Sequence, residues 1–310
     1  MKNYGFPYKG SKNRLAEKIV KLFPDAENFY DLFCGGCAIT HRALIENRWK
    51  NYVINDIDSR CHKLFLDAIN GKFKNETRWI SREDFCKLKD NDGYVAFCWS
   101  FGNGGSSYLD SKEKEPYKKA LHYAIFFNDY SLGKELGIDL SAIDGIEGIK
   151  ERRIALKKYL KETNQMEKVK YDSKSAQPLE RLQSLENLKR LQSLESLESL
   201  ERLQSLQNSN LSYDEIEIKP NSIIYCDIPY KNTDKYNNID FDHERFYSWC
   251  KKQTELCFIS SYEMPEDFIP IAEFPHRSIL CSTKNKPVLE KVFIPKHQLE
   301  LYKARLSACI

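Results

Sequence analysis

Apolar residues in the first 70 positions alternate between short continuous runs and a three-to-four-residue spacing. The runs at 28–32 and 52–54 predict buried strands, and the spaced segments 11–23, 39–47 and 61–70 predict helices. Strands and helices that alternate in this way are typical of an α/β protein with a doubly wound, mostly parallel sheet.

The last hundred residues continue this alternation. After a buried strand at 222–226, the pattern predicts a polar loop at 231–240, a helix at 242–255, a strand at 256–261 and a closing antiparallel hairpin at 278–282 and 288–294. The two ends of the chain are therefore expected to form one sheet.

The middle of the chain does not follow the alternation. Residues 117–130 are rich in aromatic side chains at helical spacing and predict a helix whose rings pack inside the protein. Residues 101–107, with three glycines, predict a flexible loop that either covers a functional site or is an ordinary surface loop. We expect a largely helical insertion here.

From Leu179 to Leu206 leucine recurs at every third position, between Glu, Arg, Lys, Gln, Ser and Asn. Three residues turn an α-helix by about 300°, so the leucines would wind around it and form no sustained coiled-coil seam. A 3₁₀-helix would align them, but long 3₁₀-helices are disfavoured. We predict a partly helical linker at 176–210, with a surface for a protein partner as the alternative.

Composition narrows the class of protein. The 310 residues suffice for one full core plus an insertion, and the net charge of +3 is small for a nucleic-acid binder. A phosphate-contacting surface would have to come from a local basic cluster, at 150–161 or 284–305, and solvated helix faces are the alternative reading of both. The sequence shows no signal peptide and no run of eighteen apolar residues, so export and membrane insertion are not expected.

The ten cysteines are scattered among apolar residues, which favours reduced, buried thiols in a cytoplasmic protein. Cys34 and Cys37 have the spacing of a redox or metal pair, but no second pair or histidine cluster accompanies them. We therefore expect structural cysteines and no metal site.

The most informative residues are Asp227-Ile228-Pro229-Tyr230, which follow the apolar run at 222–226. The Asp227 carboxylate and the Ile228 carbonyl can both accept a hydrogen bond from an exocyclic amine on a flat ring. Tyr230 offers a face for that ring to stack on, and Pro229 stiffens the turn. Two acceptors on such an amine return electron density to its nitrogen, so the segment predicts methylation of a base amine.

A methyl-donor site is indicated by the turn Phe33-Cys34-Gly35-Gly36-Cys37 between a predicted strand and a predicted helix. Glycines in such a turn let the backbone approach a ligand closely. Asp56 follows about twenty residues later, at the end of the next strand, where an acid usually binds ribose hydroxyls.

Together these residues resemble the Dam-type (D12 class) family of site-specific DNA adenine-N6 methyltransferases, which use S-adenosylmethionine (AdoMet). Four blocks carry the resemblance in the family's order: Pro7-Tyr8-Lys9-Gly10-Ser11-Lys12, Asp31-Leu32-Phe33-Cys34-Gly35-Gly36, Asp56, and Asp227-Ile228-Pro229-Tyr230. The likeness covers roughly residues 5–60 and 215–295, and it implies a Rossmann-like methyltransferase fold.

The resemblance also implies roles for individual residues. The residues implied to bind AdoMet are Tyr8, Lys12, Phe33, Gly35, Asp56 and Asp227. The residues implied to hold a flipped adenine for catalysis are Asp227, Ile228, Pro229 and Tyr230. Two positions depart from the family: Cys37 replaces the second loop glycine, so that the turn is expected to shift by a residue, and Ile228 replaces a proline. The role of position 228 is its carbonyl, so we expect activity to survive.

The implied organisation has four parts. Residues 1–70 form the AdoMet-binding half of the catalytic domain, 71–175 a target-recognition insertion, 176–210 the leucine-repeat linker and 211–310 the second catalytic half. The expected partner is DNA, with no membrane contact, and the protein is expected to be a monomer. A companion restriction endonuclease is compatible with the resemblance, and the recognition sequence cannot be read from the chain.

Three other functions compete with adenine methylation. RNA or protein-glutamine methyltransferases typically begin the catalytic block with asparagine, so Asp227 disfavours them. Cytosine-N4 methyltransferases use the same amine chemistry but usually begin the catalytic block with serine, so Asp227 favours adenine. A DNA-binding relative whose activity has decayed through Cys37 and Ile228 is the non-enzymatic alternative, and such a protein would bind no AdoMet.

Overall fold

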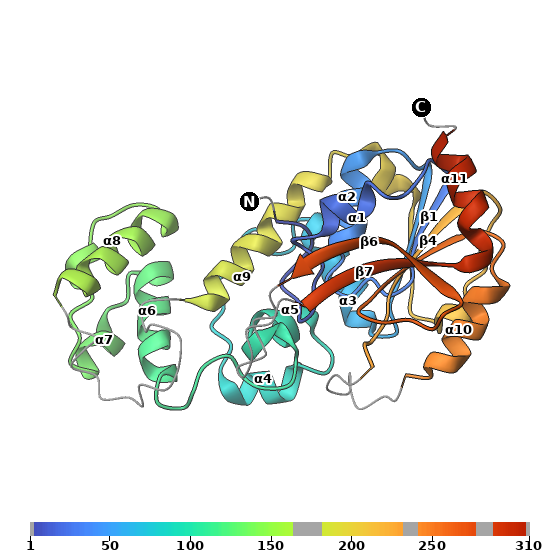
Figure 1. Ribbon diagram of the computed structural model, residues 1–310. Coiled ribbons are helices and arrows are strands. Elements are labelled where there is room, and N and C mark those ends of the chain that lie inside the picture. Colours follow the sequence, from blue (N-terminus) through green and yellow to red (C-terminus); the bar gives the residue numbers. More distant parts are fainter. Residues whose placement is uncertain (1–2, 164–181, 232–240, 277–287, 308–310) are drawn as a thin grey trace. The chain divides into compact units, whose positions relative to one another are not determined.

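The computed structural model describes residues 3–163, 182–231, 241–276 and 288–307, which divide into two compact units (Figure 1). The sheet unit consists of residues 1–6, 10–70 and 194–310, and the helical unit of residues 7–9 and 71–193. Both ends of the chain therefore contribute to the sheet unit.

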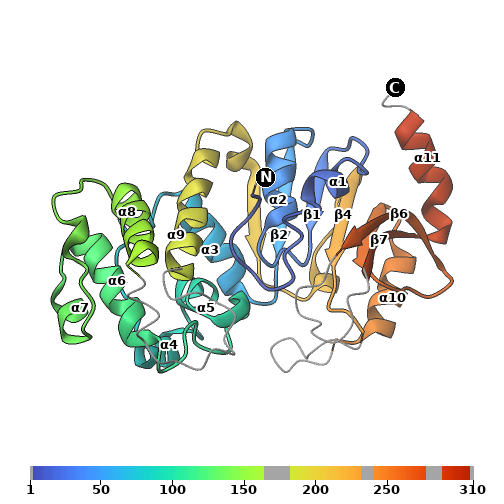
Figure 2. The same cartoon turned by 60° about the vertical axis from the view of Figure 1, so that its left-hand side comes forward.

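The sheet unit is built on a seven-stranded mixed sheet with the order β3-β2-β1-β4-β5-β7-β6 (Figure 2). Its strands are β1 (Asn28–Asp31), β2 (Asn51–Asn55), β3 (Leu206–Ser209), β4 (Ser222–Asp227), β5 (Leu256–Ser261), β6 (Phe268–His276) and β7 (Val288–Pro295). Strands β3, β2, β1, β4 and β5 are parallel, while β7 is antiparallel to both β5 and β6. The prediction of an α/β protein with a mostly parallel sheet is confirmed.

The closing hairpin starts earlier than the sequence predicted. Its first strand is β6, whereas the expected strand at 278–282 lies outside the described residues, as does most of the expected polar loop at 231–240. The apolar residues Phe268 and Ile269 begin β6, but Pro270 and Pro275 interrupt the pattern that would reveal a strand.

Five helices of the sheet unit are α1 (Ala16–Val20), α2 (Ala38–Glu46), α3 (Ser59–Ile69), α10 (His243–Lys252) and α11 (Leu299–Ser307). The helix expected at 11–23 was too long, because residues 12–15 form a turn in which the Leu15 N–H donates to the Lys12 carbonyl (2.8 Å). The turn leads into α1, and Lys12 lies before the helix begins. Its side chain is part of the candidate active site.

The core occupies both faces of the sheet. On one face, Ile224 of β4 and Ile259 of β5 pack with Phe246 of α10. On the other face, Phe258 of β5 lies between Phe23, after α1, and Tyr302 of α11, with ring centroids 4.7 and 5.5 Å away. Burial of these aromatic residues from water is the main force that stabilises the sheet unit.

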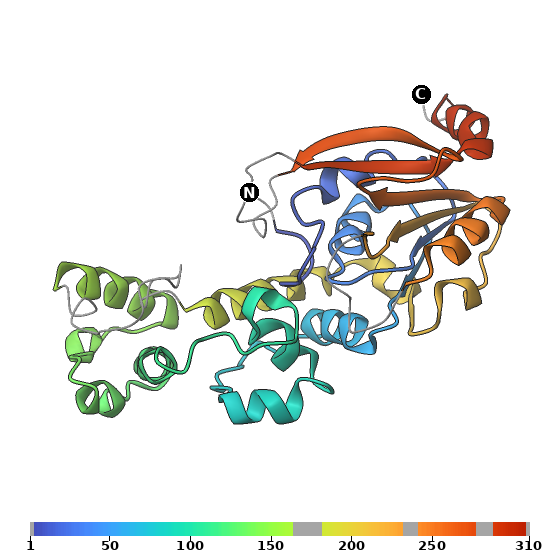
Figure 3. The same cartoon turned by 60° about the horizontal axis from the view of Figure 1, so that its bottom comes forward.

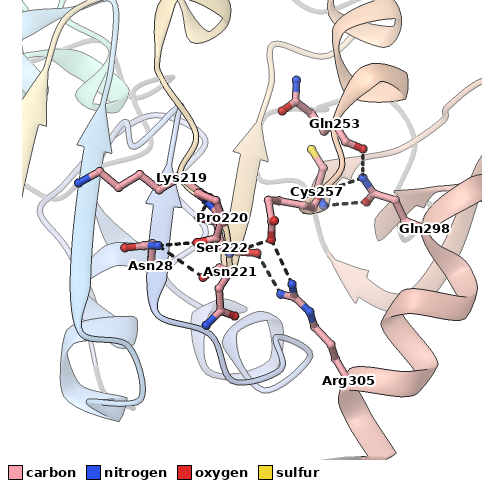
Figure 4. A network of polar contacts seen from close by, with 10 residues as sticks. Asn28, Lys219, Pro220, Asn221, Ser222, Gln253, Cys257, Gln298 and Arg305 are labelled. Carbon is pink, nitrogen blue, oxygen red and sulfur yellow. Dashed lines mark hydrogen bonds and ion pairs between the residues drawn. The ribbon is translucent and has the colours of Figure 1, made fainter.

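Polar contacts join the N-terminal ends of β4 and β5 to the C-terminal segment that includes α11 (Figure 4). The Arg305 guanidinium of α11 donates to the Ser222 carbonyl (3.3 Å) and to the Glu255 carboxylate (3.1 Å), which also accepts from the Ser222 N–H (2.8 Å). Gln298 accepts from the Cys257 N–H (2.9 Å) and donates to the Gln253 carbonyl (3.0 Å). These contacts satisfy the backbone groups where β4 and β5 begin.

The helical unit contains α4 (Arg82–Leu88), α5 (Gly93–Cys98), α6 (Glu115–Phe127), α7 (Ser131–Glu135), α8 (Ile149–Glu162) and α9 (Gln183–Gln192) (Figure 3). Its core includes Leu121, Ile125, Leu156 and Leu185, from α6, α8 and α9. The loop at 101–107 is closed by a hydrogen bond from the Phe101 N–H to the Ser107 carbonyl (2.8 Å).

The described part of the leucine repeat is partly helical and ends in a strand. Residues 183–192 form α9, residues 193–197 and 201–205 form two short 3₁₀-helices, and residues 206–209 form β3 at the edge of the sheet. Over one short α-helix the leucines drift through only part of a turn, so Leu185, Leu188 and Leu191 all remain buried. The three-residue period then fits the 3₁₀-helices, each of which is only five residues long.

Candidate active site

Three acids lie where neighbouring parallel strands end. Asp31 is the last residue of β1 and Asp227 the last of β4, while Asp56 follows β2. Asp31 pairs in register with Tyr225, so Asp31 and Asp227 point to the same face of the sheet. The carboxyl ends of parallel strands are the usual place for a ligand in such a sheet.

The side chain of Lys12 reaches the end of β4. Its ammonium donates to both carboxylate oxygens of Asp227, at 2.6 and 2.8 Å, and lies 5.0 Å from the centre of the Tyr230 ring. The Lys12 side chain is 8% exposed and the Asp227 side chain 22%, so the ion pair is only partly accessible to water. The structure therefore brings together two blocks that are far apart in the sequence, Lys12 from the first and Asp227 and Tyr230 from the last.

Glu290 of β7 completes this group and was missed in the sequence. Its carboxylate accepts a 2.5 Å hydrogen bond from the Tyr230 hydroxyl and lies 3.8 Å from the Lys12 ammonium. The side chain is 3% exposed and lies on the same face of the strand as the buried Val292. The strand also contains Lys291, so no local pattern in the sequence distinguishes Glu290.

Burial and neighbouring charges set the protonation of this group. Burial raises the pKa of Asp227 to about 6, Lys12 opposes that rise, and Glu290 adds to it. For Lys12, burial works against the charged form, but Asp227 and Glu290 outweigh it and raise the pKa of the ammonium. Asp227 is consequently ionised at neutral pH and becomes protonated as the pH falls through about 6.

Two residues of the glycine turn have left-handed backbones, Gly35 with φ of 44° and Cys37 with φ of 53°, and Cys37 is the N-cap residue of α2. Cys37 thus adopts the conformation that glycine favours. The one-residue shift of the turn relative to the family stays a prediction. The Cys37 side chain is fully buried.

Asp56 fixes the turn from the neighbouring strand. It accepts from the Gly35 N–H (2.8 Å) and from the Asp58 N–H (2.9 Å), and burial raises its pKa to about 6.

One oxygen of Asp31 accepts from the Thr40 hydroxyl (2.6 Å). The other is buried and has no hydrogen-bond partner among the described residues. Burial is also the main cause that raises the pKa of Asp31 to about 7.

The other predicted residues have separate surroundings. Phe33 packs against Tyr213, with 5.5 Å between ring centroids, and Ile228 is buried in the core cluster that contains α10. The Pro229 carbonyl accepts from His243 Nε2 (2.9 Å), which holds the turn after β4. Tyr8 belongs to the helical unit and packs edge-on against Phe97.

A family model for the D12 class N6 adenine-specific DNA methyltransferases matches residues 8–256, and a search of curated proteins finds no match. The chain belongs to this family of DNA methyltransferases. It is therefore an AdoMet-dependent, adenine-specific DNA methyltransferase. The match starts at Tyr8 and includes Lys12, the glycine turn, Asp56 and the catalytic block at 227–230.

Two negative findings accompany the match. In the described part of the chain, no helix has the length and apolar character needed to span a bilayer. The same residues contain no group of three or more His, Cys, Asp or Glu side chains arranged to hold a metal ion.

Proposed function

We propose that the methyltransferase holds a flipped adenine at the carboxyl end of β4 and methylates its N6 atom. The Asp227 carboxylate and the Ile228 carbonyl are the two acceptors for the N6 protons, and Tyr230 is the stacking surface. The observation that carries this proposal is the hydrogen-bonded group of Lys12, Asp227, Tyr230 and Glu290, in which Lys12 and Glu290 are buried and Asp227 and Tyr230 are half-buried.

The residues at the ends of β1 and β2 fit AdoMet. The buried Asp31 oxygen that lacks a partner among the described residues can accept a hydrogen bond from the ammonium of the cofactor's methionine part. Asp56, beside Gly35, can accept from ribose hydroxyls, and the positive-φ turn gives access to the backbone. AdoMet supplies the methyl group as an electrophile on its sulfonium. Tyr8 and Phe33 remain predicted cofactor contacts.

Asp227 can accept a hydrogen bond from N6 while Lys12 remains bound, because each carboxylate oxygen has two lone pairs. The Glu290 carboxylate lies 3.8 Å from the same ammonium and provides a second negative charge. The buried cation therefore keeps an anionic partner throughout, which avoids the large free-energy cost of an unpaired buried charge. Asp227 then orients N6, whose proton leaves after the methyl group arrives.

The nucleoside produced tests this proposal directly. Purified protein incubated with labelled AdoMet and mixed-sequence duplex DNA should yield N6-methyldeoxyadenosine after digestion and chromatography. N4-methyldeoxycytidine as the product would instead support the cytosine alternative. AdoMet binding without any methylated base would indicate a site other than the one proposed, and absence of AdoMet binding would support the decayed relative.

Replacing Glu290 should separate its charge from its shape. In Glu290→Gln the Asp227 pKa should fall, because the carboxylate of Glu290 raises it, and the acidic fall in methylation rate should move to lower pH. Weaker positioning of Tyr230 should also lower kcat, on the order of tenfold. The measurement is the pH dependence of kcat. Glu273→Gln, which removes a half-exposed partner of Lys291 on the same hairpin, should leave the profile in place.

A further inference from the structure

The helical unit carries a basic groove between α8 and α9. A cavity of about 270 Å³ is lined by Lys150, Arg153, Ile154, Lys157 and Lys189. The four residues from α8 are spaced i, i+3, i+4 and i+7, so they form one face of that helix. Lys189 comes from α9, which packs on α8 through the leucine core of the unit.

The charges in the groove are not balanced internally. Arg153 pairs with Glu186 of α9 at 3.1 Å, whereas Lys150, Lys157 and Lys189 form no ion pair among the described residues. Burial is the main cause that lowers the pKa of Lys189. The positive charges of Arg153 and Lys150 lower this pKa further, whereas the negative charges of Glu151 and Glu186 raise it. An anion in the groove would relieve this repulsion.

The remaining features suit an extended polyanion. Lys150 and Lys157 are exposed at the two ends of the stripe, about 10 Å apart along the helix at 1.5 Å per residue. Successive phosphates of one nucleic-acid strand are about 3.4 Å apart along the helix axis. The distance between the two lysines therefore corresponds to about three phosphate steps. Ile154 is 59% exposed between the cations, where it can contact the apolar part of a sugar or a thymine methyl group.

We infer that the α8–α9 groove binds DNA phosphates, with Lys150, Lys157 and Lys189 as the contacting cations. This inference rests on the proposed function, because it makes the helical unit a positioning surface for the DNA that the sheet unit methylates. Contacts of this type fix position and strengthen binding without reading sequence.

The test is the salt dependence of binding to a mixed-sequence duplex of about 30 base pairs, followed by fluorescence anisotropy. The plot of log K against log salt has a negative slope, and each lost phosphate contact reduces its magnitude by about 0.9. In the double variant Lys150→Gln/Lys157→Gln the magnitude of the slope should therefore fall by nearly 2. The control Lys87→Gln/Lys134→Gln removes two exposed lysines of the same unit, outside the groove, and should keep the wild-type slope. The control variant should also keep the wild-type kcat.

An unchanged slope in the groove variant, with wild-type thermal unfolding, would overturn the inference. Equal losses in the groove and control variants would overturn it as well, because the effect would then be one of net charge. Failure of the proposed function gives a different result, since the wild-type protein would then produce no methylated adenine whatever the slopes are.

Discussion

Asp227→Ala should abolish methylation, with a loss of at least about 10³-fold in kcat, because it removes both the proposed acceptor for N6 and the anchor of Lys12. The loss is large because a water molecule in place of the carboxylate would have neither its negative charge nor its fixed position. Initial rates with labelled AdoMet and duplex DNA measure it.

The fold should survive this substitution. Lys12 keeps Glu290 at 3.8 Å, so its charge is not left without an anion, and the core clusters on both faces of the sheet are untouched. Circular dichroism and thermal unfolding should therefore remain close to wild type. Asp267→Ala removes an exposed acid paired with Lys251 in the same unit and should retain full activity. Substantial methylation by Asp227→Ala would refute the assigned role.

A conservative replacement separates shape from charge. Asp227→Asn retains one acceptor oxygen and almost the same volume, yet it loses the negative charge that holds Lys12 and stabilises positive charge developing on N6. It should be nearly as inactive as the alanine variant. Recovery of a large fraction of the rate would show that hydrogen-bond geometry, rather than charge, is the main contribution of Asp227.

The pattern of apolar residues predicted most of the sheet because its central strands are buried on both faces. Strand β5 was located without error, and β1, β2 and β4 to within a few residues. Such strands are continuous apolar runs, which sequence reveals well. The edge strands β3 and β6 were missed, because β3 is polar and β6 contains prolines.

The candidate site contains residues that a local sequence pattern reveals and one residue that only its tertiary contacts reveal. Asp227 and Gly35 stand in local patterns, a strand end and a glycine turn, so the sequence could single them out. Glu290 is recognisable only through its contacts with Lys12 and Tyr230, which come from distant parts of the chain. The pairing of β7 beside β5 brings it there, and no local pattern encodes that pairing.

The two departures from the family pattern have physical explanations. Ile228 is buried among the residues that pack near α10, so its side chain adds apolar contacts there. Cys37 adopts a left-handed backbone at the start of α2, a conformation that costs a non-glycine residue about 1–2 kcal/mol. Full burial of its side chain offsets part of that cost.

Gly5→Ala should disrupt the glycine turn, although Gly5 itself lies outside that turn. Gly5 has φ of +64°, its N–H donates to His41 Nδ1 (2.8 Å), and a Cβ atom there would overlap the Gly36 carbonyl oxygen. The overlapping group is backbone, which cannot move aside as a flexible side chain could. The same carbonyl accepts from the Phe6 N–H (3.0 Å), so the N-terminal segment and the turn must shift together.

A displacement of about 1 Å in a positioning element can lower the rate on the order of 100-fold, and overpacking of this kind destabilises the fold by about 1–3 kcal/mol. We therefore expect kcat/KM for AdoMet to fall on the order of 100-fold in Gly5→Ala, together with a lower Tm. Gly145→Ala is the matched control, because Gly145 also has a left-handed backbone, φ of +74°, but its Cβ would meet open space. That variant should show only the strain of about 1 kcal/mol and unchanged AdoMet kinetics. If both variants bind and use AdoMet equally well, the close packing of Gly5 against Gly36 does not support the cofactor turn.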